Sequence, residues 1–198
     1  FSLRSEGSQG VGDFGDLSLL ANFAATAGMH AIQLLPIYDT TQTHTWSDCY
    51  PYSAISIYAL HPMYADLRQL PRLHSRDVMS RFETRAAQLN ALPQVDYEGV
   101  NQLKHDYLQM LYAQEGPAVM ASDDYRKYYA ENEDWLLPYT AFCLLRDQYG
   151  TSDFRQWPEC SVYQPGEIRL IAEHRSKETG YYAFVQYILD KQLKQAAA

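Results

Sequence analysis

AIQLLPIYDTTQTHTWSDCYPYSAISIYALHPMY, residues 31–64, is the most informative segment of the sequence. It begins with an apolar segment, residues 31–36, which predicts a short buried strand. A loop of Asp, Thr, His, Trp and Tyr follows, and a tyrosine-rich apolar segment runs from there to Pro62. Loops that follow strands build the binding sites of many α/β enzymes. By residue type alone, an ordinary core strand with a surface loop fits equally well.

The segment before this stretch predicts a loop and then a helix. Residues 1–15 carry four glycines, which predict tight turns without the lysine of a phosphate-binding loop. Asp16 is the expected N-cap of the helix, and Gly28 is its expected end. The apolar residues expected on one face of this helix are Leu19 or Leu20, Phe23, Ala24 and Ala27. Helix, turn and strand together form one step of a parallel α/β architecture.

The chain after Pro71 predicts helices only. The expected helical ranges are 75–90, 96–114, 122–132, 133–149, 167–175 and 178–198. Gly116-Pro117 is expected to end the second of them. Pro138 is expected in the first turn of a separate helix capped by Asp134, where no intrahelical N–H bond is lost. A single strand among several helices is an unusual balance for a complete α/β domain, so we expect a piece of a longer protein.

Composition excludes several classes of function. The net charge is −8 and there is no basic tract, which argues against nucleic acid and anionic membranes as partners. No apolar run has the ~18 residues of a membrane helix. The three cysteines form no CxxC pair, so a disulfide framework and a cysteine zinc site are not expected. These features favour a reducing cytoplasm.

Few residues have the spacing that catalysis or metal binding requires. There is no GxSxG motif, and Cys49 lies five residues after His44 with nothing else to support a Cys–His site. The histidines lack metal-ligand spacing, so we expect no metal and no cofactor. Glycoside chemistry needs two carboxyl groups about 5 to 9.5 Å apart. Acidic residues in the loops, Asp13, Asp16, Asp39 and Asp48, have no evident partner of this kind.

Recognition of a sugar is better supported by the residue types. Trp46 and Tyr52 offer flat stacking faces, and a pyranose ring presents apolar faces with a rim of hydroxyl groups. Side chains able to bind those hydroxyl groups are Asp39, Thr40, His44, Asp48 and Ser53. The alternative is that Tyr52 and Tyr58 simply pack beneath the loop.

Several blocks of sequence resemble one enzyme family. FSLRSEGSQGVGDFGDL (1–17), AIQLLPIYDTT (31–41) and SDCYPYSAISIYALHP (47–62) resemble the N-terminal part of the catalytic domain of 4-alpha-glucanotransferases, the amylomaltases and disproportionating enzymes. Tyr50 stands where Ser is usual, and His61 stands where Asn is usual. With ENEDWLLPYTAFCLLRD (131–147) and TSDFRQWPECSVY (151–163), these departures are similar to the branch of the plant cytosolic disproportionating enzyme.

The resemblance implies an α/β fold, the first portion of a (β/α)₈ barrel with a largely helical insertion, so that this chain is mostly α-helical. Residues 1–71 would hold the first strand and the substrate loop. Residues 72–165 would form the inserted helical subdomain, and residues 166–198 would return to the barrel. The candidate substrate-binding residues are Tyr52, Asp39, Asp48, Trp46, Ser53 and His61. Tyr52 matches the family tyrosine that lines the subsite next to the cleaved bond.

Family members transfer α-1,4-glucan segments by a retaining double displacement that uses an Asp nucleophile, a Glu acid–base and a further Asp. No residue in this chain matches those three, so we expect no catalytic residue here and an inactive piece. The expected partner is an α-1,4-glucan or a malto-oligosaccharide, and the oligomeric state stays open. The alternative hypothesis is a non-catalytic helical module that binds carbohydrate or another protein.

Overall fold

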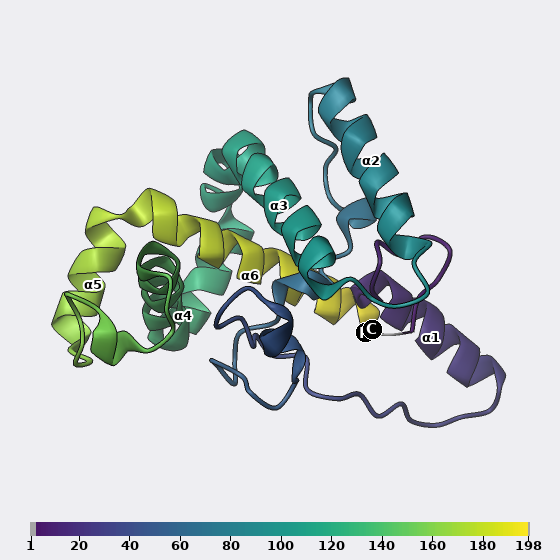
Figure 1. The fold of residues 1–198 in the computed structure, drawn as a ribbon, viewed down its shortest axis with the longest axis horizontal. Helices are drawn as coiled ribbons and strands as arrows, with labels where there is room; N and C mark the ends of the chain where they lie inside the picture. The colour runs from purple at the N-terminus through teal and green to yellow at the C-terminus, as the bar shows by residue number, and fades with distance from the viewer. Residues whose placement is uncertain (1–2, 198) are drawn as a thin grey trace.

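The computed structural model describes residues 3–197. The helices are α1 (Phe14–Thr26), α2 (Arg76–Asn90), α3 (Tyr97–Met120), α4 (Asp123–Tyr149), α5 (Pro165–His174) and α6 (Ser176–Ala196), with the short 3₁₀ helices η1 (Trp46–Cys49), η2 (Pro62–Tyr64), η3 (Leu67–Gln69) and η4 (Phe154–Gln156). α6 runs through the middle of the molecule, and α1, α3, α4 and α5 all pack against it (Figure 1). α2 packs on α3 at one side.

The expected strand at residues 31–36 is not formed, and that prediction is wrong for this chain. Ile32, Leu34 and Leu35 are 37%, 44% and 64% exposed, and the segment crosses below the helices as an extended coil (Figure 1). A strand needs a neighbour to bond its N–H and C=O groups. In the described part of the chain, β pairing is limited to an isolated antiparallel bridge between Tyr38 and Leu60.

α1 is also positioned differently from the expectation. Its N-cap is Asp13, whose carboxylate accepts hydrogen bonds from the N–H groups of Gly15 and Asp16. Asp16 is the third helical residue and bonds back to the Asp13 N–H, completing a capping box. Leu19 and Phe23, expected to face a core, are 55% and 65% exposed. Leu17 and Leu20 of α1 line one pocket together with Leu34 and Leu35, so α1 and residues 31–35 share an apolar surface that the described residues leave open.

α3 and α4 are longer than expected, and both contain a proline. α3 continues through Gly116-Pro117 to Met120, and α4 is one helix that holds Pro138 in its interior. An internal proline costs about 3 kcal/mol through its lost hydrogen bond and its steric clash. Packing offsets this cost, since Val119 lies against the core after Pro117, and Leu136 and Tyr139 are buried on either side of Pro138.

Other helix ends follow their local signals. Ser75 caps α2 and Ser122 caps α4 through their side-chain oxygens, and Gly150 ends α4 with a left-handed φ of 66°. The glycine-rich start forms tight turns as expected. At Gly10, φ is 92° and an added Cβ would lie 2.7 Å from a Val100 methyl, so this turn requires glycine.

The largest core cluster joins α6 to α3, α1 and residues 60–73. Residues 3–197 include no helix that combines the length and the hydrophobicity needed to cross a bilayer.

Candidate functional site

The loop singled out by the sequence is closed at its base by a short antiparallel pair. Asp39 N–H donates to Ala59 O at 2.8 Å, and His61 N–H donates to Ile37 O at 3.0 Å. These two bonds flank the bridge between Tyr38 and Leu60. We call residues 39–59 the aromatic loop. These hydrogen bonds hold the two ends of the aromatic loop together.

Asp48 organises the first half of the aromatic loop. Its Oδ2 accepts hydrogen bonds from three successive backbone N–H groups, those of Gln42, Thr43 and His44, at 3.0, 2.9 and 2.7 Å. The Asp48 side chain is buried, and His44 adopts a positive φ of 58° beside it. The sequence predicted that the Asp48 carboxylate binds sugar hydroxyl groups. In the structure this carboxylate instead accepts hydrogen bonds from the backbone of the loop.

Asp39 is equally enclosed. It is 1% exposed, and its Oδ1 accepts hydrogen bonds from the N–H and the hydroxyl of Thr41 at 3.0 and 2.6 Å. Its Oδ2 accepts a hydrogen bond from the Tyr139 hydroxyl of α4 at 2.7 Å. Asp39 thus ties the entry of the aromatic loop to α4.

His61 lies beneath the aromatic loop and is 3% exposed. Its Nδ1 accepts a hydrogen bond from Met63 N–H at 3.1 Å, and its Nε2 is 3.0 Å from the Tyr97 hydroxyl. Burial lowers the pKa of His61, so the ring is neutral with its proton on Nε2. These bonds engage both ring nitrogens inside the protein.

Tyr52, Trp46 and Ser53 are the candidates that reach the surface. Tyr52 is 61% exposed and lies against the equally exposed Tyr50, with ring centroids 5.4 Å apart. Trp46 is 56% exposed and meets Tyr97 edge-on at 5.9 Å. The structure therefore separates the six candidates into three exposed residues and three buried ones, and their contacts with a substrate stay a prediction.

Tyr58, which the alternative interpretation buried beneath the loop, is 60% exposed, and its partner Trp135 was not identified from the sequence. Tyr58 stacks on Trp135 of α4, with centroids 5.8 Å apart and planes 22° apart. Beside this stack is a pocket of about 360 Å³, lined among others by Ile55, Ser56, Trp135, Phe142, Trp157 and Tyr163. The segment 133–149 is apolar nearly all round, so its sequence pattern could not indicate which face would open onto a pocket.

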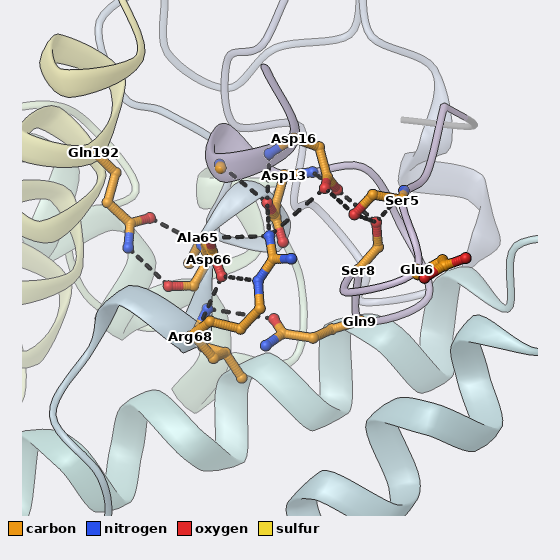
Figure 2. Close-up of polar contacts among 12 residues, drawn as sticks. Ser5, Glu6, Ser8, Gln9, Asp13, Asp16, Ala65, Asp66, Arg68 and Gln192 are labelled. Carbon is orange, nitrogen blue, oxygen red and sulfur yellow. Dashed lines mark hydrogen bonds and ion pairs between the residues drawn. The ribbon is translucent and has the colours of Figure 1, made fainter. Parts of the chain in front are cut away.

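A cluster of buried carboxylates around the partly exposed Arg68 joins the glycine-rich start to the segment after the aromatic loop (Figure 2). The Arg68 guanidinium bonds Asp66 at 2.7 Å and Asp13 at 3.1 Å, while Ser5 and Ser8 donate to Asp16 at 2.6 Å each. Although burial acts in the opposite direction, these serine hydrogen bonds lower the pKa of Asp16. The carboxylates that had no evident partner in the sequence are therefore occupied in a structural network.

Lys104 is the buried cation of this charge cluster. It is 1% exposed, and its Nζ donates to Ala65 O at 2.6 Å and lies 3.9 Å from Asp13 Oδ2. Burial raises the pKa of Asp13 to about 6, although the Lys104 ammonium opposes the increase. Burial likewise lowers the pKa of Lys104 to about 8, against the attraction of Asp13. Both groups are therefore charged at neutral pH.

The pKa of Asp13 predicts a pH dependence of stability. Between about pH 4 and pH 6 the folded protein holds a proton on Asp13 that the unfolded chain has released, so stability falls as pH rises across this window. Asn at this position keeps the helix cap but cannot titrate. We expect the free energy of unfolding of wild type, minus that of Asp13→Asn, to decrease from pH 4 to pH 6 in urea titrations.

A difference between wild type and Asp13→Asn that stays constant from pH 4 to pH 6 would contradict the assignment of the proton to Asp13.

Among the residues that the structure describes, no three His, Cys, Asp or Glu side chains lie close enough together to hold a metal ion.

Comparison with known proteins places the chain in one family. A family model described as 4-alpha-glucanotransferase matches residues 1–198. The 4-alpha-glucanotransferase DPE2 of Oryza sativa subsp. japonica is 38% identical over 202 residues, which cover 100% of this chain and 21% of the rice protein. The 4-alpha-glucanotransferase of Chlamydia caviae is 29% identical over 202 residues, 100% of this chain and 36% of that protein. The chain thus spans well under half the length of these relatives, and it belongs to the 4-alpha-glucanotransferase family.

Proposed function

We propose that the full-length protein transfers α-1,4-glucan segments between malto-oligosaccharides by a retaining double displacement, and that this chain supplies one wall of its glucan-binding cleft. The observation that carries the proposal is Tyr52, which lies 61% exposed on a loop whose base and backbone are rigidly bonded. An exposed ring on an anchored loop can stack on a glucosyl unit without a large loss of conformational entropy. In this proposal Trp46 and Ser53 contact the same glucan, while Asp39, Asp48 and His61 shape the wall.

We place residues 31–36 as the opening strand of a (β/α)₈ barrel in the full-length protein. The uncovered apolar surface of α1 and residues 31–35 supports this placement, because barrel strands are apolar and bonded on both edges. In this division residues 1–71 start the barrel, residues 72–165 form the helical insertion, and residues 166–198 lead back to the barrel. The catalytic carboxylates would then come from strands outside this chain. The three cysteines are free thiols, which supports a cytoplasmic location.

The test is incubation of the full-length protein with maltotriose, followed by analysis of glucose and of longer products. A transferase releases glucose and builds longer malto-oligosaccharides in parallel, because a sugar hydroxyl accepts the glucosyl segment. If glucose and maltose form without any longer chain, the enzyme is a hydrolase and the proposal fails. If the full-length protein binds maltotriose but leaves it unchanged, the non-catalytic module is the better description.

A further inference from the structure

The side-chain amide of Gln186 bonds the backbone of Leu60, the residue that follows the aromatic loop. In the bridge with Tyr38, the N–H and C=O of Leu60 point away from the partner segment, because the flanking residues make the bonds. Both groups are taken by Gln186 of α6. Gln186 Oε1 accepts from Leu60 N–H at 2.8 Å, and its Nε2 donates to Leu60 O at 2.8 Å. The glutamine thereby occupies the position that a further strand would take.

The same amide is linked to the entry of the aromatic loop. Gln186 Nε2 also donates to the Tyr139 hydroxyl at 3.2 Å, and that hydroxyl donates to Asp39 Oδ2 at 2.7 Å. Gln186, Tyr139 and Asp39 are 2%, 7% and 1% exposed, so water does not compete for these bonds. Burial raises the pKa of Tyr139, which keeps its hydroxyl protonated as a donor. One chain of hydrogen bonds therefore joins α6 and α4 to both ends of the loop.

A second glutamine provides a matched comparison. Gln192 accepts from Asp66 N–H at 2.9 Å and donates to Asp66 O at 2.8 Å, and it is also buried (Figure 2). Gln192 follows Gln186 by six residues on α6, as Asp66 follows Leu60 along the chain. The two amides make the same pair of backbone bonds, but Asp66 lies outside the aromatic loop. Loss of either amide removes the same pair of backbone bonds, but Gln186 also bonds Tyr139, whose hydroxyl leads to Asp39 at the entry of the aromatic loop.

We propose that Gln186 is a positioning residue for glucan binding: its amide replaces an edge strand at Leu60 and, through Tyr139 and Asp39, sets the orientation of the loop that presents Tyr52. Gln192 performs the equivalent structural task at Asp66 without acting on that loop. The inference rests on the proposed function only where it assigns a glucan to Tyr52. The fixing of the loop by Gln186 can be measured without any activity.

Hydrogen exchange of the full-length protein tests the fixing of the loop. Gln186→Met keeps the length of the side chain and removes both hydrogen-bonding atoms. We expect Gln186→Met to speed exchange at least about tenfold in peptides covering residues 39–59, where Ile55 N–H donates to Asp39 O. Residues 62–70 should stay protected in this variant. Gln192→Met should instead speed exchange in residues 62–70 and leave residues 39–59 protected. Equal changes in both segments for the two variants would overturn the proposal.

Steady-state kinetics of the same variants tests the consequence for the substrate. Gln186→Met should raise the KM for maltotriose about tenfold, with kcat within about twofold of wild type, because binding is impaired and the catalytic carboxylates are untouched. Gln192→Met should keep the wild-type KM. A KM that is unchanged in Gln186→Met, or raised equally in both variants, overturns the positioning role.

Tyr139→Phe keeps the test decisive if Gln186→Met does not fold. Tyr139→Phe removes the hydroxyl that links Gln186 to Asp39, and it keeps both hydrogen bonds between Gln186 and Leu60. We expect faster exchange at the loop entry and a smaller increase in KM, and a wild-type result in both measurements would overturn the proposal. A wild-type enzyme without transferase activity would reject the proposed function, whereas exchange would still decide the role of Gln186.

Discussion

Replacement of Lys104 by Met is expected to lower the free energy of unfolding by about 3–5 kcal/mol, the cost typical of removing one partner of a buried ion pair. The ammonium is 1% exposed, donates to Ala65 O and lies 3.9 Å from Asp13 Oδ2. Met fills most of the same volume but leaves the Ala65 carbonyl without its donor. It also leaves the Asp13 carboxylate without its ammonium neighbour in a site where burial already raises its pKa. Urea denaturation at pH 7 measures the loss.

Two further variants separate charge from packing at this site. The double variant Lys104→Met with Asp13→Asn should recover part of the lost stability, because Asn removes one of the three carboxylates that Arg68 alone would otherwise neutralise. Lys194→Met is the surface control, since Lys194 is 72% exposed and pairs with Asp190 one turn away, so it should change stability by no more than about 0.5 kcal/mol. A loss below about 1 kcal/mol for Lys104→Met would contradict the importance of the buried pair.

Tyr52→Ala in the full-length protein is expected to lower kcat/KM for malto-oligosaccharides by a factor of about 5 to 150, equivalent to about 1–3 kcal/mol. The ring is 61% exposed, and it lies at a tilt of 49° against the ring of Tyr50. The variant should therefore lose substrate contacts and little stability. Transfer assays with maltotriose and thermal unfolding of the same samples separate the two effects.

Tyr52→Phe and Tyr163→Ala complete this experiment. Phe keeps the stacking face, so a rate close to wild type assigns the effect to the ring and a low rate assigns it to the hydroxyl. Tyr163 is 60% exposed and lies outside the aromatic loop, which makes it the matched exposed tyrosine. If Tyr52→Ala retains the full rate, or if Tyr163→Ala loses as much, Tyr52 does not line the glucan subsite.

The candidate site was predictable only as far as residue type determines exposure. Aromatic side chains in a polar loop indicated a stacking surface, and Tyr52 and Trp46 are exposed. The acidic candidates Asp39 and Asp48 are predicted by residue type to offer hydrogen bonds to the hydroxyl groups of a sugar. Asp39 and Asp48 are instead buried, because three backbone N–H groups converge on Asp48 and a hydroxyl of a distant helix reaches Asp39. Sequence spacing does not reveal a donor that lies 100 residues away.

Features that depend on neighbouring residues could be predicted from the sequence alone. Ser75 and Ser122 start helices and Gly150 ends one, since a cap is a bond between residues three or four positions apart or a single left-handed φ. The motifs around Tyr52 likewise indicated the 4-alpha-glucanotransferase family. The remaining features depend on contacts between distant segments. Pro117 and Pro138 stay inside helices because packing outweighs a local penalty, residues 31–36 form no strand without a bonded neighbour, and Gln186 binds Leu60 across 126 positions of the chain.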